Sequence, residues 1–282
     1  MTALSNCGQP ENLAGAASSG NEKYGIFDSH AHYDDAQFDA DREELLGRVL
    51  PEKGVCGILN MGADLKGCKD TVALTERYEY LYGAVGIHPE CARELPDNWL
   101  NLLREWLKCE KIVAVGEIGL DYHWLEECPK ERQKKVFSAQ LELAEELSLP
   151  VIIHDREAHA DTLEFLQRYR PSGVVHCFSG SVETAREILK LGMYIGLGGA
   201  VTFKNARHSV EAAREIPLER LLLETDAPYM APRALPRQTE RFFPHRLCCG
   251  KNRRDSWNSR RGCTACSRRK YPAPVWHSMK TQ

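Results

Sequence analysis

The stretch KIVAVGEIGLDYHWLEECPKERQKKVFSAQLELAEELSLPVIIHDRE, residues 111–157, contains two apolar runs separated by an amphipathic segment. The runs 111–121 and 149–157 are rich in Val, Ile, Leu and Gly, as expected for strands of a parallel sheet that is covered on its outer face. Between them, the segment 129–149 has a proline at its start and an apolar face that includes Val136, Leu141, Leu143 and Leu147. The order strand, helix, strand predicts a parallel βαβ unit.

The same alternation continues along the chain. Amphipathic segments separate the apolar runs, and in one of them Ser181 is placed to cap a helix that Gly192 ends. Eight strand–helix repeats within about 200 residues predict an α/β fold, a TIM-type (β/α)₈ barrel. The alternative, a doubly wound open sheet, would usually show a glycine-rich phosphate loop early in the chain, and none is present. The eight predicted strands lie within residues 24–32, 54–62, 80–88, 111–121, 149–157, 172–180, 192–200 and 220–228.

The charge of the chain is unevenly distributed. The 282 residues carry a formal net charge of −3, but residues 233–282 contain 13 Lys/Arg and two Asp/Glu, a net of +11, which leaves −14 for residues 1–232. A basic tail on an acidic domain normally suggests contact with nucleic acid. We therefore divide the chain into a disordered N-terminal extension (1–23), a barrel domain (24–232) and a basic, Cys-rich tail (233–282).

Composition also restricts the cellular location. The chain has 43% hydrophobic and 27% charged residues and no apolar run of membrane-spanning length. Its Gly/Ser/Ala-rich start lacks the basic and apolar regions of a secretory signal. Seven of the 11 cysteines are scattered singly before residue 233, which is typical of reduced thiols. These features predict a cytoplasmic protein that does not associate with a membrane.

Residues that bind metals follow the predicted strands. In a parallel barrel the carboxyl ends of all strands meet at one face, where catalytic groups of this fold reside. The first strand ends in an HxH pair, whose two side chains point the same way because strand side chains alternate. Four histidines and two carboxylates at that face are sufficient to bind two divalent metal ions, with one carboxylate bridging. The predicted metal-binding residues are His30, His32, Glu117, His154, His176 and Asp226.

Each of these residues alone has a structural interpretation. A single histidine at a strand end is more often a packing residue, and a single carboxylate such as Glu117 or Asp226 often caps the next helix. The placement of all six at successive strand ends favours the metal site. Two further residues, His88 and Arg156, follow the third and fifth strands, and we assign them as contacts for a substrate phosphate.

The ordered motifs FDSHAHYDD, GIHPE, GEIGLDYH, PVIIHDREA, HCFSGS, GLGGAVTFKNA and LLLETDAPYMAP strongly resemble the TatD family of metal-dependent deoxyribonucleases, within the amidohydrolase-like hydrolases. The resemblance covers residues 24–232. It implies a TIM-type barrel that hydrolyses nucleic-acid phosphodiesters, often as a 3′–5′ exonuclease on single strands. It also implies the division of ligands: His30, His32 and Asp226 on one ion, His154 and His176 on the other, and Glu117 bridging both.

The chemistry expected of such a site is activation of water by two ions, which orient it and lower its pKa. Asp226 is the predicted proton acceptor, so Glu117 and Asp226 are the predicted catalytic residues. Imidazole-rich ligation favours Zn, Mn, Fe, Ni or Co over Mg, whereas family members are usually described as Mg²⁺-dependent, so the ion is left as Mg, Mn or Zn. The predicted substrate is single-stranded DNA or another nucleic-acid end, with no obligate protein partner. The alternatives are hydrolysis of a small ester, amide or lactone, and a folding-defective, inactive product.

The tail departs from the family after residue 232. Its second cysteine pair, 263 and 266, has the CxxC spacing of a zinc site, but the first pair, 248 and 249, is adjacent, which is a poor spacing for a tetrahedral site. Back-translation into the next reading frame can yield strings that resemble the family's ending, and a stop codon is forced at Met279–Lys280. We therefore interpret the tail as the product of a frameshift near Arg233. That interpretation predicts a disordered tail and a barrel that lacks its last outer helix.

Overall fold

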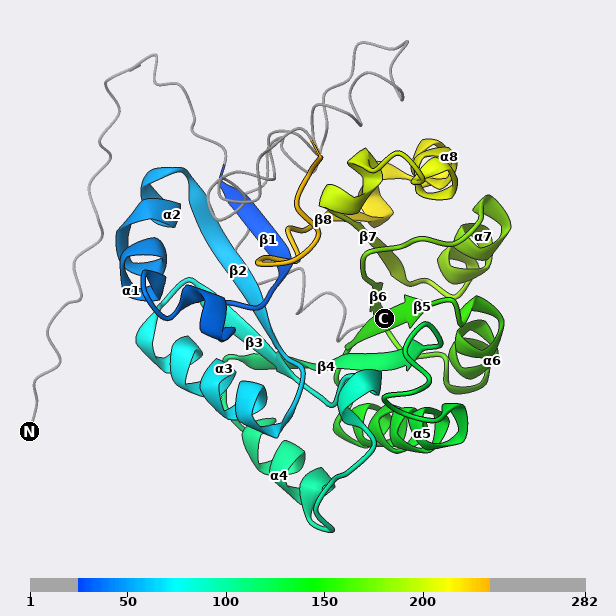
Figure 1. The fold of residues 1–282 in the computed structure, drawn as a ribbon, viewed down its shortest axis with the longest axis horizontal. Helices are drawn as coiled ribbons and strands as arrows, with labels where there is room; N and C mark the ends of the chain where they lie inside the picture. Colours follow the sequence, from blue (N-terminus) through cyan, green and yellow to red (C-terminus); the bar gives the residue numbers. More distant parts are fainter. Residues whose placement is uncertain (1–24, 234–282) are drawn as a thin grey trace, which may run out of the picture.

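A computed structural model describes residues 25–233 of the chain, and these residues form a barrel of eight parallel strands (Figure 1). The strands follow one another around the sheet in sequence order, so each hydrogen-bonds the next along the chain. Every strand lies inside one of the eight predicted runs, and the predicted barrel is confirmed. The strands are β1 Ile26–Ala31, β2 Val55–Gly62, β3 Leu81–Val85, β4 Ile112–Asp121, β5 Val151–Arg156, β6 Gly173–Val175, β7 Tyr194–Leu197 and β8 Leu221–Leu223.

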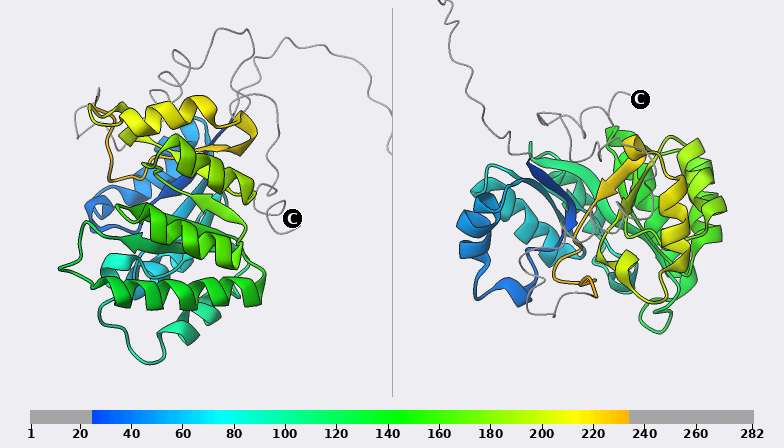
Figure 2. Two further views of the ribbon diagram at one scale, coloured as in Figure 1. Left: turned by 90° about the vertical axis from the view of Figure 1, so that its right-hand side faces the viewer. Right: turned by 90° about the horizontal axis from the view of Figure 1, so that it is seen from above.

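The helices lie on the outside of the sheet, as Figures 1 and 2 show. The connection from β1 to β2 combines two short α-helices around a π-helical turn, Leu45–Val49. Within residues 25–233 no helix follows β8. The α-helices are α1 Arg42–Glu44, α2 Leu50–Glu52, α3 Leu65–Arg77, α4 Trp99–Trp106, α5 Lys130–Leu147, α6 His159–Tyr169, α7 Val182–Lys190 and α8 Arg207–Glu215.

Local sequence fixes where these helices begin and end. The Ser181 hydroxyl accepts a hydrogen bond from the Thr184 N–H, and this cap starts α7 as predicted. Gly192 lies two residues after Lys190, the last residue of α7, with a φ of +83°, the left-handed conformation that favours glycine and stops a helix. Pro129 precedes the first residue of α5, where its missing N–H breaks no hydrogen bond.

The first and last strands of the barrel are joined differently from the other neighbouring strands. β1 has a single bridge to the segment that follows β8, Ala31 to Ala227, in place of a continuous ladder. Side chains complete the seam: the Thr225 hydroxyl donates to Asp28 Oδ2 at 2.7 Å, and the Ser29 hydroxyl donates to the Leu223 carbonyl at 3.0 Å. The first and last strands are therefore joined largely by polar side chains, next to the carboxyl-end face.

Helix α5 holds two strand ends in place through buried glutamines. Gln140 accepts from the Ile87 N–H at 2.7 Å and donates to the Ile87 carbonyl at 3.1 Å. Gln133 binds both backbone groups of Asp121, accepting from its N–H at 2.8 Å and donating to its carbonyl at 2.7 Å. Both side chains are almost completely buried. The pair fixes the backbone beside His88 and at the end of β4.

Replacing Gln140 by leucine should destabilise the barrel. The change keeps the volume but leaves the buried N–H and C=O of Ile87 without their partner, which costs about 2–5 kcal/mol in the free energy of unfolding. Urea unfolding measures it, with the exposed Lys135→Gln change on the same helix as control. Equal stability of the two variants would show that the glutamine contact is not stabilising.

Three predictions concern residues beyond those described. The N-terminal extension, the tail after Arg233 and the missing last helix all lie outside residues 25–233. Within the part of the chain that the structure describes, every helix is too short or too polar to cross a bilayer.

Candidate metal centre

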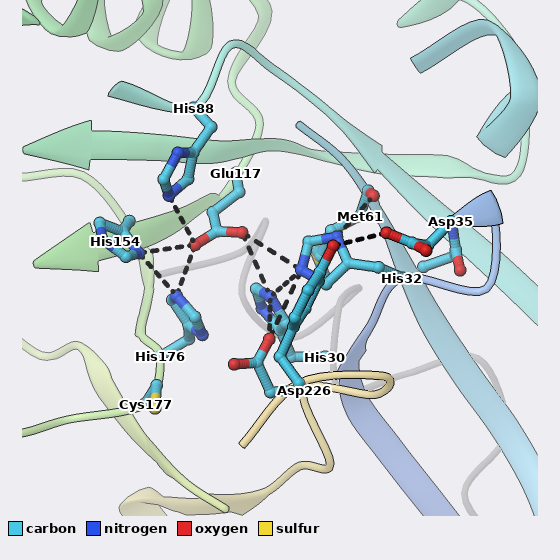
Figure 3. Close-up of polar contacts among 12 residues, drawn as sticks. His30, His32, Asp35, Met61, His88, Glu117, His154, His176, Cys177 and Asp226 are labelled. Atoms are coloured by element: carbon cyan, nitrogen blue, oxygen red, sulfur yellow. Dashed lines mark hydrogen bonds and ion pairs between the residues drawn. The ribbon is translucent and has the colours of Figure 1, made fainter. Parts of the chain in front are cut away.

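Figure 3 shows the predicted metal-binding side chains converging at the carboxyl ends of the strands. His30 and His32 come from the end of β1, Glu117 from β4, His154 from β5, and His176 directly follows β6. Asp226 follows β8. The structure therefore brings all six side chains to one place, and the Glu117 carboxylate lies at its centre.

One group of ligand atoms surrounds Glu117 Oε2. His30 Nε2 and His32 Nε2 lie 3.3 and 3.5 Å from this oxygen and 3.1 Å from each other. Asp226 Oδ1 lies 3.6 and 3.5 Å from the same two nitrogens. Tetrahedral ligands at about 2.0–2.2 Å from an ion are roughly 3.3–3.6 Å apart. The spacing of these atoms therefore fits a shared cation.

A second group surrounds the other oxygen, Glu117 Oε1. His154 Nδ1 lies 2.9 Å and His176 Nε2 2.6 Å from it, and the two nitrogens are 3.3 Å apart. The shorter distances to the carboxylate are those of charge-assisted hydrogen bonds. The two oxygens of one carboxylate thus face two different sets of imidazoles, the arrangement required of a bridging ligand.

His88 lies beside the second group. Its Nε2 is 3.7 Å from Glu117 Oε1, and its Nδ1 accepts a hydrogen bond from the Glu90 N–H. Burial, reinforced by the charge of His154, lowers the pKa of His88 to about 3. With Nδ1 used as acceptor, the neutral ring carries its proton on Nε2. His88 therefore presents a donor toward the site.

The other predicted phosphate contact, Arg156, ends β5. Its guanidinium carbon lies 5.8 Å from the centroid of the Trp124 ring. Its backbone carbonyl accepts from the Tyr122 N–H, which ties the ends of β4 and β5 together. The structure thus places Arg156 at the rim of the site, outside both ligand groups.

Histidine protons balance the negative charge of the centre. Burial alone would lower the pKa of His32, but the contacts with Asp226 and Glu117 outweigh burial and raise this pKa to about 9. Burial likewise opposes the shift at His154, whose pKa is raised to about 10 by hydrogen bonds with Asp121 and Glu117. Burial and the neighbouring His176 lower the pKa of His30 to about 4. Positive charge is therefore needed here, and a divalent cation could supply it in place of these protons.

Two carboxylates that the sequence analysis did not select complete the centre. Asp121 Oδ2 lies 2.9 Å from His154 Nε2, so this carboxylate can orient the imidazole from the side opposite the nitrogen that faces Glu117. Glu224 is buried, and its Oε1 accepts from the Cys177 N–H at 2.5 Å, 3.9 Å from His176 Nδ1. Burial, partly offset by His176, raises the pKa of Glu224 to about 8.

A glycine makes room for Glu224. A Cβ on Gly196 would lie 2.3 Å from Glu224 Oε2, so any larger residue there would displace this carboxyl group. Strand alternation could have identified Asp121, which lies four residues after Glu117 in β4 and so shares its inward face. Glu224 follows the last residue of β8, where alternation no longer applies.

A family model described as TatD related DNase matches residues 27–254 of the chain. The chain belongs to the TatD-related DNase family. The predicted family and the predicted enzyme class, a metal-dependent hydrolase that acts on ester bonds, are thereby confirmed. The match extends beyond residue 232, where the sequence analysis placed the end of the resemblance.

Individual members of the TatD family are similar over most of their length. An uncharacterized metal-dependent hydrolase, YabD, from Bacillus subtilis is 43% identical over 210 residues, 73% of this chain and 82% of its own. A 3′-5′ ssDNA/RNA exonuclease TatD from Cronobacter sakazakii is 38% identical over 232 residues, 79% of this chain and 88% of its own. The crystal structure of the TatD homolog YjjV from Escherichia coli superposes with a TM-score of 0.73 at 31% identity, covering 92% of this chain and 95% of that one.

Proposed function

We propose that the chain hydrolyses phosphodiester bonds in single-stranded nucleic acid from the 3′ end, with two divalent ions at the centre around Glu117. The observation that carries the proposal is the division of ligands between the two Glu117 oxygens. The name of the Cronobacter relative, an exonuclease on ssDNA and RNA, supports the substrate class.

The proposed ligands divide between two positions. His30, His32 and Asp226 would hold one ion, His154 and His176 the other, with Glu117 shared. Such ions lower the pKa of water and neutralise charge on the phosphate and the leaving oxygen. Zn, Mn and Mg all remain candidates, because the site is rich in imidazole while its carboxylates also suit harder ions.

The side chains of the protein would handle the proton and the phosphate. Burial opposes ionisation, but the contact with His32 and the charge of His30 lower the pKa of Asp226, which keeps its carboxylate ionised. We propose that the Asp226 carboxylate accepts the proton of the attacking water. The proton on His88 Nε2 and the guanidinium of Arg156 would bind phosphate oxygens.

Metal removal and a substrate panel test the proposal. After dialysis against a chelator, hydrolysis of a 5-mer of single-stranded DNA should fall by at least about 10³-fold and return with Mn²⁺, Mg²⁺ or Zn²⁺. RNA of the same sequence should also be cleaved, with products shortened one nucleotide at a time from the 3′ end.

The panel also includes small esters, amides and lactones. Metal-dependent cleavage of these compounds without cleavage of either oligonucleotide would sink the nuclease proposal in favour of a small-molecule hydrolase. Protein that binds no metal and cleaves nothing would support the third possibility, an inactive product. The cytoplasmic location and the lack of an obligate protein partner stay predictions.

A further inference from the structure

Large apolar side chains are exposed at two loops beside the metal centre. Among residues 25–233, Trp124, Leu125, Tyr229 and Met230 are the large hydrophobic residues that are exposed, at 43%, 42%, 44% and 37%. The first pair follows β4 and the second pair follows β8. Exposed apolar side chains gathered at the mouth of a site are informative, because exposed apolar patches often mark ligand-binding surfaces.

The two loops lie on opposite sides of the mouth. β4 and β8 are four places apart in a barrel of eight strands, and their carboxyl ends face each other across the centre. The Tyr229 ring lies 5.7 Å from the His32 ring, and its hydroxyl donates to Asp35. The Tyr229 ring is therefore next to the proposed metal ligand His32, and the Trp124 ring lies across the opening.

A positive charge accompanies the more distant ring. The Arg156 guanidinium is 5.8 Å from the Trp124 centroid, and among the described residues no carboxylate forms an ion pair with it. The donors of the guanidinium are therefore available to a ligand at the mouth.

We propose that Trp124 and Arg156 form a nucleotide subsite, in which the indole stacks on a base and the guanidinium binds a backbone phosphate. This inference rests on the proposed nuclease function and specifies its substrate. Stacking on an aromatic ring requires a base with a free face, which an unpaired strand offers and a duplex interior does not.

Steady-state kinetics on a single-stranded DNA 5-mer test the subsite. Trp124→Ala should raise KM about ten- to a hundredfold, because stacking contributes about 1–3 kcal/mol per base, with kcat changed less than about threefold. Trp124→Phe keeps a π face and should restore most of the affinity. Leu125→Ala, an equally exposed neighbour on the same loop, is the matched control.

Oligonucleotides with one abasic position complete a double-mutant cycle. At the position that stacks on Trp124, removing the base should raise KM of the wild-type enzyme as much as Trp124→Ala does, and the variant should lose nothing further. Equal effects of Trp124→Ala and Leu125→Ala, or a Trp124→Ala penalty that persists on every abasic strand, would overturn the subsite while leaving the nuclease function intact. A wild-type enzyme that cleaves small esters but no oligonucleotide would instead overturn the function itself.

Discussion

Replacing Glu117 by glutamine should remove nearly all hydrolytic activity. The change is isosteric, but it takes away the buried negative charge whose two oxygens contact His30, His32, His154 and His176. Groups behind metal ligands typically contribute 10–100-fold, so a shared ligand should contribute about 10³-fold or more to kcat/KM. Metal analysis of the same protein should show fewer than two ions per chain.

The control for Glu117 is Glu90→Gln. Glu90 is an exposed acid in the loop after β3, at the same mouth but outside both ligand groups. Its substitution should change kcat/KM by less than about twofold. If Glu117→Gln retained two ions and full activity, the shared carboxylate would have no role and the two-ion centre would have to be abandoned.

Replacing Asp226 by asparagine should lower kcat about 10²–10⁴-fold, the usual contribution of a positioned proton acceptor. Asparagine is the suitable replacement because Asp226 has a φ of +60°, a left-handed conformation that asparagine tolerates and most residues do not. The variant therefore removes charge without adding backbone strain. Pre-steady-state kinetics on the 5-mer at saturating metal separates the chemical step from metal loss.

Asp121→Asn is the control that distinguishes the loss of a proton acceptor from a loss of metal affinity. Asp121 contacts the far nitrogen of His154 and no reacting group, so its substitution should weaken metal affinity about 10–100-fold and leave kcat nearly unchanged at saturating metal. Asp226→Asn activity that recovers fully with added metal would make Asp226 a ligand only. The proton acceptor would then be another group.

Much of the barrel could be predicted from sequence because its pattern is repetitive. Each strand is a short apolar run bounded by turn residues, and eight such runs allow few other folds. The alternation of side chains along a strand also predicted that the two histidines of the HxH pair point the same way. The strand pattern does not give the distance between β4 and β6. The family resemblance implied that Glu117 and His176 share an ion, and the structure places Glu117 Oε1 2.6 Å from His176 Nε2. That contact arises from barrel closure, which no local pattern specifies.

The residues whose roles were not fully predicted from sequence were missed for one physical reason. Asp121 contacts His154 from behind, and Glu224 contacts the Cys177 N–H beside His176, so a search for ligand motifs such as HxH selects neither acid. His88 appears in sequence as a rim residue, whereas the structure brings its Nε2 within 3.7 Å of Glu117 because Gln140 fixes the preceding backbone. Such positions depend on packing between elements far apart in the chain.

The polar seam between β1 and β8 has a consequence for the robustness of the whole domain. His30 and Thr225, which lie on its two sides, are separated by 195 positions in the sequence. An ion coordinated by His30, His32 and Asp226 would be a cross-link between the beginning and the end of the barrel. Cross-links that close long loops restrict the unfolded chain most. A bound ion at this position would therefore stabilise the closed barrel through chain entropy, in addition to its role in catalysis.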